Sequence, residues 1–402
     1  MVSLQDVYQA RENLTGIIHK TNLDLSHTFS EIAGNLVFLK TENLQKTGSF
    51  KIRGAYNHIV SLSPEERAKG VIAASAGNHA QGVAYGATRA GIPSTIVMPE
   101  GAPISKLIAT QGYGAKVILH GNVYDDAYNK ALEIQKEQGA TFVHAFDNRE
   151  VIAGQGTIGL EILDEVPDID AILVPIGGGG LISGIAVAVK ALKPGVKIIG
   201  VEAAEAACFK TSRGRGKLCN LEKAHTIADG IAVKCPGELT YNLVERYVDD
   251  IVTVSDGEIA STIMLLLERA KLVAEGAGAT ALAALIYKKT QLRNKKIAAV
   301  ISGGNIDMNF ISRIIEKGLV KTGRNVKLKA IITDKPGNLQ QFLRIIAENK
   351  ANVIAINHDR SKEEIPLDQA VVQIVLETQS SEHVNIIVKN LNNAGFLTEI
   401  DN

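Results

Sequence analysis

Residues 171–189 read AILVPIGGGGLISGIAVAV, an apolar run that ends in four consecutive glycines and continues as a second apolar stretch. The first run, AILVPI at 171–176, is short and carries no charge, which is typical of a strand buried on both faces of a parallel sheet. The glycines mark a tight turn before the next segment. The stretch therefore predicts a strand, a turn and a helix in an α/β protein.

Short apolar runs of the same kind alternate with helix-like segments from about residue 36 to residue 320. Crossover helices between such runs make the strands parallel. We therefore predict an α/β fold with mostly parallel sheets for this part of the chain. The other predicted strands are VIAAS (71–75), STIVMP (94–99), AKVILH (115–120), KIIGVE (197–202) and IAAVIS (297–302).

The composition excludes several classes of protein. The 402 residues contain 43 Lys and Arg and 43 Asp and Glu, so no basic surface for nucleic acid is indicated. Neither a signal peptide nor an apolar run of transmembrane length is visible. Cys208, Cys219 and Cys235 are widely spaced, which predicts reduced, at least partly buried thiols rather than disulfides or a zinc site. These features favour a cytoplasmic protein that acts on a small molecule.

The pattern changes after Gly318. A short polar stretch leads into a strand, the turn DKPG, a helix, two strands, a second helix and a last strand. This βαββαβ order is that of a small ferredoxin-like domain. We therefore place a domain boundary near residue 322, with a first region at 1–321, a linker at 322–326 and a C-terminal domain at 327–402.

KTGSFKIRGA, at residues 46–55, places a lysine between two apolar side chains. Lys51 lies between Phe50 and Ile52, directly after a Thr-Gly-Ser turn signal. Its ammonium group is either solvated on a half-buried element or held in a desolvated pocket, where its pKa falls and the amine becomes nucleophilic. Taken alone, this stretch favours the solvated interpretation.

The SAGNH turn at 75–79 follows a predicted strand and precedes a predicted helix. Backbone N–H groups at such a helix start can bind an anion, and Ser75, Asn78 and His79 are additional donors. The alternative is an N-capped helix with a surface histidine.

Two further turns contain adjacent glycines. The tetraglycine at 177–180 would let the backbone wrap closely around a ligand such as phosphate, although it matches neither a P-loop nor a dinucleotide-binding motif. SGGN at 302–305 ends a buried strand and would present Ser302 inward, but Gly-Gly-Asn is also common in ordinary turns.

The motifs GSFKIRGA, SAGNHAQG, GGGGLISG and SGGN are much more specific together, in this order and at these separations. Over residues 1–320 the chain resembles the threonine and serine dehydratases of the tryptophan-synthase-like, fold type II group of pyridoxal-phosphate enzymes. The C-terminal segment, with DKPGNL at 334–339, looks like an ACT regulatory domain. The resemblance implies a two-lobed catalytic region, in which a small lobe at about 49–150 is inserted in the large lobe.

The resemblance implies pyridoxal 5′-phosphate as the cofactor and Lys51 as the catalytic residue joined to its aldehyde. The tetraglycine would hold the cofactor phosphate, Asn78 the ring hydroxyl and Ser302 the pyridine nitrogen. The carboxylate of an amino-acid substrate would bind the SAGNH turn. The predicted cofactor contacts are Phe50, Lys51, Asn78, Gly177, Gly178, Gly179, Gly180, Leu181 and Ser302. The predicted substrate contacts are Ser75, Ala76, Gly77, Asn78 and His79.

The implied reaction is a β-elimination. Lys51 would remove the α-proton, the β-hydroxyl would leave as water, and threonine would give 2-oxobutanoate and ammonia, or serine pyruvate and ammonia. A hydroxyl group at Ser302 leaves the ring nitrogen largely unprotonated, which suits elimination better than transamination. Related serine racemases carry a serine where this chain has Ala76, which argues for dehydration rather than racemisation.

Other functions stay open at this point. They are a serine or 3-hydroxyaspartate dehydratase, a β-replacement enzyme such as cysteine synthase, threonine synthase, and a catalytically idle amino-acid sensor. SAGNHAQG favours the dehydratases over the β-replacement enzymes. The presence of Lys51, Asn78, the tetraglycine and Ser302 together argues against the sensor.

Members of the family often bind a cation close to the strand that corresponds to KIIGVE. The matching ligands here are Glu202 and the carbonyl of Ala206, while Cys208 replaces an acidic residue of the magnesium-dependent racemases. A thiol is a poor ligand for a hard cation, so we expect potassium, or another monovalent or divalent ion, if a cation binds. The alternative is that Glu202 is a solvated residue at a strand end.

The ACT-like domain implies control by an amino acid. In such domains the first strand-to-helix turn contributes to an effector site, often between two subunits. We expect inhibition by isoleucine, opposed by valine, and a homodimer or homotetramer; a purely structural turn is the alternative. The predicted regulatory residues are Asp334, Lys335, Pro336, Gly337, Asn338 and Leu339.

Overall fold

The structure is a computed structural model that describes residues 2–361 and 366–401. The chain divides into two compact units between Asp307 and Met308, and each unit is described by itself.

The first unit contains a six-stranded sheet, which defines its large lobe. The strand order is β1-β2-β10-β7-β8-β9, and every neighbouring pair is parallel except β1 and β2. The prediction of mostly parallel sheets is confirmed. The strands are β1 (Leu23–Leu25), β2 (Leu36–Lys40), β7 (Ala171–Pro175), β8 (Lys197–Ala203), β9 (Asp250–Val254) and β10 (Lys296–Val300).

A second, four-stranded sheet of the first unit defines its small lobe. The order is β5-β4-β3-β6, and all its neighbouring strands are parallel. These strands fall within 49–150, the range that we predicted for the small lobe. They are β3 (Val71–Ala74), β4 (Ser94–Met98), β5 (Lys116–Leu119) and β6 (Thr141–Phe142).

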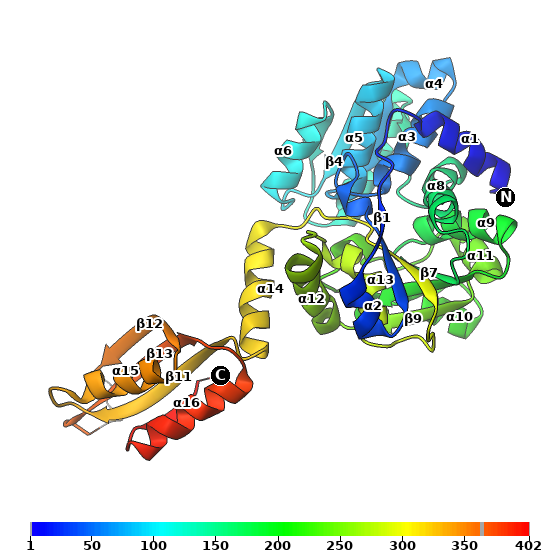
Figure 1. Ribbon diagram of the computed structural model, residues 1–402. Helices are drawn as coiled ribbons and strands as arrows, with labels where there is room; N and C mark the ends of the chain where they lie inside the picture. Colours follow the sequence, from blue (N-terminus) through cyan, green and yellow to red (C-terminus); the bar gives the residue numbers. More distant parts are fainter. Residues whose placement is uncertain (1, 362–365, 402) are drawn as a thin grey trace. The chain divides into compact units, whose positions relative to one another are not determined.

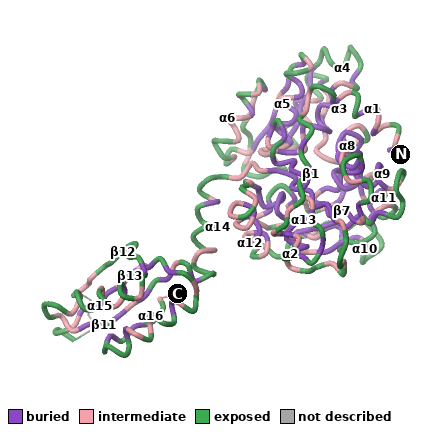
Figure 2. Tube along the Cα trace, viewed as in Figure 1, coloured by how far each residue is buried: buried purple, intermediate pink, exposed green. Residues whose placement is uncertain are grey.

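Helices surround both sheets of the first unit (Figure 1). They are α1 (Leu4–Leu14), α2 (His27–Ala33), α3 (Lys51–Ser61), α4 (Pro64–Lys69), α5 (Asn78–Ala90), α6 (Ile104–Gly112), α7 (Tyr124–Gln138), α8 (Arg149–Glu165), α9 (Gly180–Leu192), α10 (Cys208–Arg215), α11 (Glu238–Tyr247), α12 (Asp256–Leu265) and α13 (Gly276–Ile286). Every residue of β3 and β7 is buried, and Figure 2 shows the buried trace in the interior of this unit. Burial on both faces explains why these strands appear in the sequence as continuous apolar runs.

The second unit contains one antiparallel sheet with the order β12-β13-β11-β14. Apolar side chains of α15 and α16, among them Phe342 and Ile387, pack with the strands in one core. The predicted βαββαβ ferredoxin-like arrangement is confirmed. The elements are α14 (Met308–Lys321), β11 (Asn325–Thr333), α15 (Asn338–Glu348), β12 (Asn352–Asp359), β13 (Gln369–Glu377), α16 (Ser381–Asn393) and β14 (Leu397–Ile400).

The division of the chain differs from our prediction near residue 322. Helix α14 belongs to the second unit, and the predicted linker at 322–326 is a short turn that runs into β11 at Asn325. A polar, glycine-containing turn within a unit has the same composition as a linker between units, so composition alone does not distinguish the two.

Candidate active site

A cavity of about 810 Å³ in the first unit collects all four sequence motifs. Lys51 lies at the start of α3, and the SAGNH turn and the tetraglycine follow β3 and β7. Ser302, just after β10, lines the same cavity. Turns at the carboxyl ends of parallel strands are the usual place for ligand sites in α/β folds. All predicted cofactor and substrate contacts line this cavity: Phe50, Lys51, Ser75, Ala76, Gly77, Asn78, His79, Gly177, Gly178, Gly179, Gly180, Leu181 and Ser302.

Lys51 is half-buried, and its Nζ donates a hydrogen bond to the carbonyl oxygen of Ala145 at 3.1 Å. Desolvation of the amine lowers the pKa of Lys51 to about 8, and the charge of Glu275 opposes this effect. The N–H group of Phe50 donates to the carbonyl oxygen of Ser302 at 3.1 Å, which ties the lysine stretch to the SGGN turn. The solvated interpretation of Lys51 is therefore wrong.

The tetraglycine forms a close-packed turn at the start of α9. Gly179 has a φ of 91°, which strongly favours glycine. A Cβ atom on Gly178 would lie 2.3 Å from the ring of Phe146. The first backbone N–H groups of a helix have no partner within the helix, and they attract an anion together with the helix dipole. The turn therefore fits the phosphate of pyridoxal 5′-phosphate.

The SAGNH turn begins α5, and its side chains are already hydrogen-bonded. The amide nitrogen of Asn78 donates to Glu275 at 2.7 Å, and its amide oxygen accepts from Asn305 at 2.8 Å. The Oγ of Ser75 accepts the N–H group of Gly77 at 3.1 Å. Contact between Asn78 and the cofactor hydroxyl stays a prediction, since its donor group is directed to Glu275 in this structure.

His79 is buried rather than a surface residue. Its Nε2 lies 2.8 Å from the carbonyl oxygen of Val143, and burial, reinforced by the charge of Lys51, lowers the pKa of His79 to about 3. The imidazole is therefore neutral near pH 7, and a neutral Nε2–H is the donor to this carbonyl. His79 consequently contributes no positive charge to the site.

Several charged residues of the cavity were missed in the sequence, among them Glu275, Asp229 and Lys106. Glu275 is buried, and burial together with the nearby charge of Asp229 raises its pKa to about 7. Lys106 of α6 forms a 3.0 Å ion pair with Asp229, joining the small lobe to the large one. In the sequence, the one feature that points to Glu275 is its place as a single carboxylate directly before the uncharged helix GAGATALAALI.

The predicted cation ligands lie outside the cavity lining. Glu202 is fully buried, so the solvated alternative is wrong. Its two carboxylate oxygens accept the N–H groups of Phe209 at 2.8 Å and Lys210 at 2.9 Å, at the start of α10, and burial raises its pKa to about 7. Ala206 is buried in the turn before α10. Among residues 2–361 and 366–401, no cluster of three His, Cys, Asp or Glu side chains is arranged to hold a metal ion, and the cation stays a prediction.

The remaining sequence predictions concern the cysteines, the membrane and the regulatory turn. Cys208 and Cys219 are buried free thiols, and Cys235 is a half-buried free thiol, as predicted. No helix in the described part of the chain is long and apolar enough to cross a membrane. The turn from Asp334 to Leu339 joins β11 to α15, and Asp334 forms a 2.9 Å ion pair with Arg360.

Comparison with known proteins identifies the family. Residues 14–303 match the family described as pyridoxal-phosphate dependent enzyme. An L-threonine ammonia-lyase of Thermotoga maritima is 52% identical over 400 residues, which is 100% of both chains. The processed form of threonine deaminase isoform 2 from Solanum lycopersicum has a TM-score of 0.75 and 37% identity, covering 78% of this chain and 87% of that one. Maize serine racemase has a TM-score of 0.75 and 36% identity, covering 80% and 98%. The chain therefore belongs to the pyridoxal-phosphate-dependent enzymes.

Proposed function

We propose that this chain is an L-threonine ammonia-lyase, which converts L-threonine into 2-oxobutanoate and ammonia and turns L-serine into pyruvate as a side activity. The observation that carries the proposal is the Lys51 amine, which shares one cavity with the tetraglycine and the SAGNH turn. Similarity along the whole chain to the Thermotoga maritima L-threonine ammonia-lyase supports the same reaction.

The cofactor would be held at both ends. When bound, pyridoxal 5′-phosphate supplies a conjugated ring that accepts the electron pair left on the substrate Cα. Lys51 would bond its aldehyde carbon, and the start of α9 at Gly177–Gly180 would hold its phosphate. Phe50 would lie beside the ring, and Ser302 would face the ring nitrogen.

Once the substrate amine has replaced it on the aldehyde carbon, Lys51 is also the base in the proposed reaction. Because its pKa is lowered to about 8, a substantial fraction of the amine is neutral near that pH and can take the proton from the substrate Cα. The β-hydroxyl group gains a proton, which balances the one taken from Cα, and leaves as water. The resulting enamine tautomerises and is hydrolysed to 2-oxobutanoate and ammonia. One water is released and one is taken up, so the overall reaction is balanced.

The substrate carboxylate would bind at the start of α5. The backbone N–H groups of this first turn carry partial positive charge. His79 is neutral, so the helix start supplies the attraction for the carboxylate, with Ser75 beside it.

Ala76 favours elimination over racemisation. It lines the cavity, and its methyl group can neither donate nor accept a proton. A racemase must reprotonate Cα from the opposite face, which requires a second acid. Related serine racemases carry a serine at the matching position, and this chain lacks that group.

The test is an absorbance spectrum of the purified protein after incubation with pyridoxal 5′-phosphate, followed by an assay of 2-oxo acid formation. We expect a visible band that is absent in Lys51→Ala, and release of 2-oxobutanoate from L-threonine. A coloured protein that is inert to threonine but active on serine or 3-hydroxyaspartate, or in β-replacement, would contradict threonine as the substrate. A colourless protein would contradict the proposed cofactor and activity, and the amino-acid sensor would be the remaining hypothesis.

Regulation and assembly are further proposals. The second unit has the ferredoxin-like arrangement expected of an ACT domain, and the turn from Asp334 to Leu339 would contribute to an effector site. We propose inhibition by isoleucine, opposed by valine, in a cytoplasmic homodimer or homotetramer. Titration of each amino acid into the assay, with the oligomer size measured by light scattering, tests this. No effect of any branched-chain amino acid on rate or size would refute it.

A further inference from the structure

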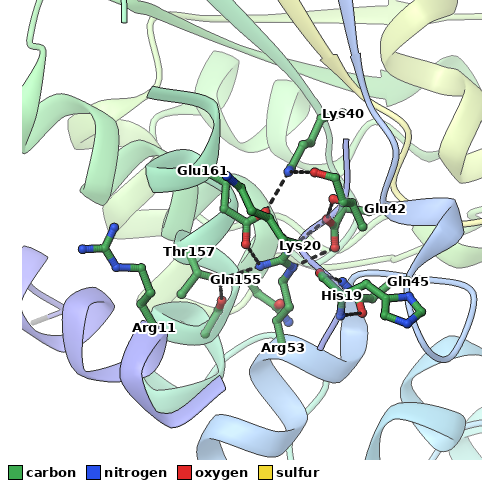
Figure 3. A network of polar contacts seen from close by, with 12 residues as sticks. Arg11, His19, Lys20, Lys40, Glu42, Gln45, Arg53, Gln155, Thr157 and Glu161 are labelled. Carbon is green, nitrogen blue, oxygen red and sulfur yellow. Dashed lines mark hydrogen bonds and ion pairs between the residues drawn. The ribbon is translucent and has the colours of Figure 1, made fainter. Parts of the chain in front are cut away.

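Arg53, two residues after Lys51, makes an unusually complete set of contacts inside the first unit (Figure 3). Its side chain has no exposed surface. Nε and Nη2 donate to the two oxygens of Glu42, each at 2.8 Å. Nη1 and Nη2 donate to the two oxygens of Glu161 at 2.6 and 2.9 Å, and Nη1 also donates to Thr157 at 3.0 Å. These contacts use all five N–H donors of the guanidinium group.

A second buried cation balances the charges. The Nζ of Lys40 has no exposed surface around it and donates to Glu161 at 2.7 Å and to the carbonyl oxygen of Thr21 at 2.6 Å. Lys40, Glu42, Arg53 and Glu161 thus form a neutral group of two cations and two carboxylates, which we call the buried quartet. Taking such charges out of water is expensive, so a quartet of this kind is a weak source of stability. Its geometry, in contrast, is strongly constrained.

The quartet joins three segments, one of which lies about a hundred residues further along the chain. Arg53 belongs to α3, Glu161 to α8, and Glu42 to a short turn directly after β2. Lys51 is the first residue of α3. A guanidinium group that is bidentate to two carboxylates restricts both the rotation of α3 about its axis and its shift along it.

Helix α8 connects this anchor to the tetraglycine by close backbone contacts. A Cβ atom on Gly154 of α8 would lie 2.5 Å from the carbonyl oxygen of Arg53. On either side of Gly154, the backbone of Ile152 and Gly156 contacts α9. A Cβ atom on Gly184 would lie 2.2 Å from the Ile152 carbonyl oxygen and 2.6 Å from the Gly156 nitrogen. Helix α9 begins at Gly180. The start of α3 and the start of α9 are therefore linked through one intervening helix.

We propose that Arg53 is a positioning residue for Lys51. By holding α3 against α8 and the end of β2, it sets the place of the Lys51 amine relative to the helix start that would bind the cofactor phosphate. The amine then meets the cofactor aldehyde in the orientation needed for condensation, in which a C=N bond forms and one water is released. The inference rests on the proposed function only for its catalytic consequence, since this condensation does not involve threonine.

The test compares Arg53→Met with Lys40→Met. Each variant removes one positive charge from the buried quartet, but only Arg53 belongs to the helix that carries Lys51. The apoenzymes are mixed with pyridoxal 5′-phosphate in a stopped-flow spectrophotometer, and the bond is trapped with borohydride and located by peptide mapping. We expect condensation at Lys51 to slow by about 10- to 100-fold in Arg53→Met and by less than about twofold in Lys40→Met. Thermal unfolding of both apoenzymes should shift to lower temperature.

Arg53→Lys keeps the proposal testable if Arg53→Met does not fold. It retains the charge but not the planar fork, so we expect slowed condensation with a smaller loss of thermal stability. Wild-type condensation rates in a folded Arg53 variant, or equal slowing in Lys40→Met, would mean that the quartet is only structural and would overturn the inference. A wild-type enzyme that condenses with the cofactor but releases no 2-oxobutanoate would refute the proposed substrate and leave this comparison intact.

Discussion

The side-chain amide of Asn78 donates a 2.7 Å hydrogen bond to the carboxyl group of Glu275, 197 positions later in the chain. Both residues line the cavity that contains Lys51. The negative charge of Glu275 raises the pKa of Lys51 and so opposes the effect of desolvation. Glu275 is thus part of the electrostatic environment in which the amine must be neutral to react.

The first prediction concerns the pH dependence of this amine. Because only the neutral amine attacks an aldehyde, the rate at which the apoenzyme condenses with pyridoxal 5′-phosphate should rise with pH around a midpoint of about 8. Glu275→Gln removes a negative charge that favours the ammonium form, so the midpoint should move to lower pH. Stopped-flow absorbance, recorded from about two pH units below the midpoint to about two above it, measures both midpoints. An unchanged or higher midpoint would contradict the coupling.

The second prediction concerns the tetraglycine. Gly178→Ala places a methyl group 2.3 Å from the ring of Phe146, so the turn must move. Overpacking of this kind costs about 1–3 kcal/mol, and we expect weaker binding of pyridoxal 5′-phosphate, measured by fluorescence titration. Gly195→Ala is the matched control, since a Cβ atom there has no neighbour within 4 Å. Equal affinities in the two variants would argue against this turn as the phosphate site.

The third prediction concerns Glu202, whose pKa is raised from 4.5 to about 7 by burial. Between these values the folded state binds more protons than the unfolded state, so the contribution of Glu202 makes the free energy of unfolding fall as pH rises from 4.5 to 7. In urea denaturation series measured across this pH range, Glu202→Gln should make the free energy of unfolding depend less on pH. Glu205→Gln, at an exposed residue, should leave this dependence unchanged. A slope that is identical in Glu202→Gln and wild type would contradict the pKa shift.

The fourth prediction concerns the second unit. Phe342 is fully buried in its core, 5.4 Å from Phe396 between ring centroids. Phe342→Ala should destabilise this unit by about 3–5 kcal/mol, because a large cavity replaces the ring. Calorimetry should show one transition moved to lower temperature, while the visible absorbance of the bound cofactor persists to the wild-type temperature. Loss of both signals at one lowered temperature would mean that the two units unfold together.

Sequence patterns located β3, β7, β8 and β10 because these strands are almost entirely buried. They also located β5, whose residues are half-buried or exposed, but they named no strand at β1, β6 or β9. The β7 residues at 171–175 are all buried, so their apolar run is uninterrupted. The turns that follow such strands must carry the ligand site in an α/β fold, which is why the SAGNH, tetraglycine and SGGN motifs meet in one cavity.

These patterns could not predict contacts between distant segments. Glu275 acquires its role only where folding brings it to Asn78, and Arg53 looks like an exposed charge until Glu42 and Glu161 surround it. A periodic pattern reports the direction of a side chain relative to its own element, and it carries no information on which distant residue lies opposite.

The pairing of β2 with β10 has a consequence for synthesis of the chain on the ribosome. Leu36 pairs with Lys296, so the central part of the large sheet cannot form until nearly all of the first unit has been translated. The small-lobe strands, at 71–142, are complete much earlier and can assemble while the rest of the chain is still emerging. During this interval β2 lacks its parallel neighbour β10, so the nascent enzyme exposes an apolar strand edge that chaperones are suited to cover.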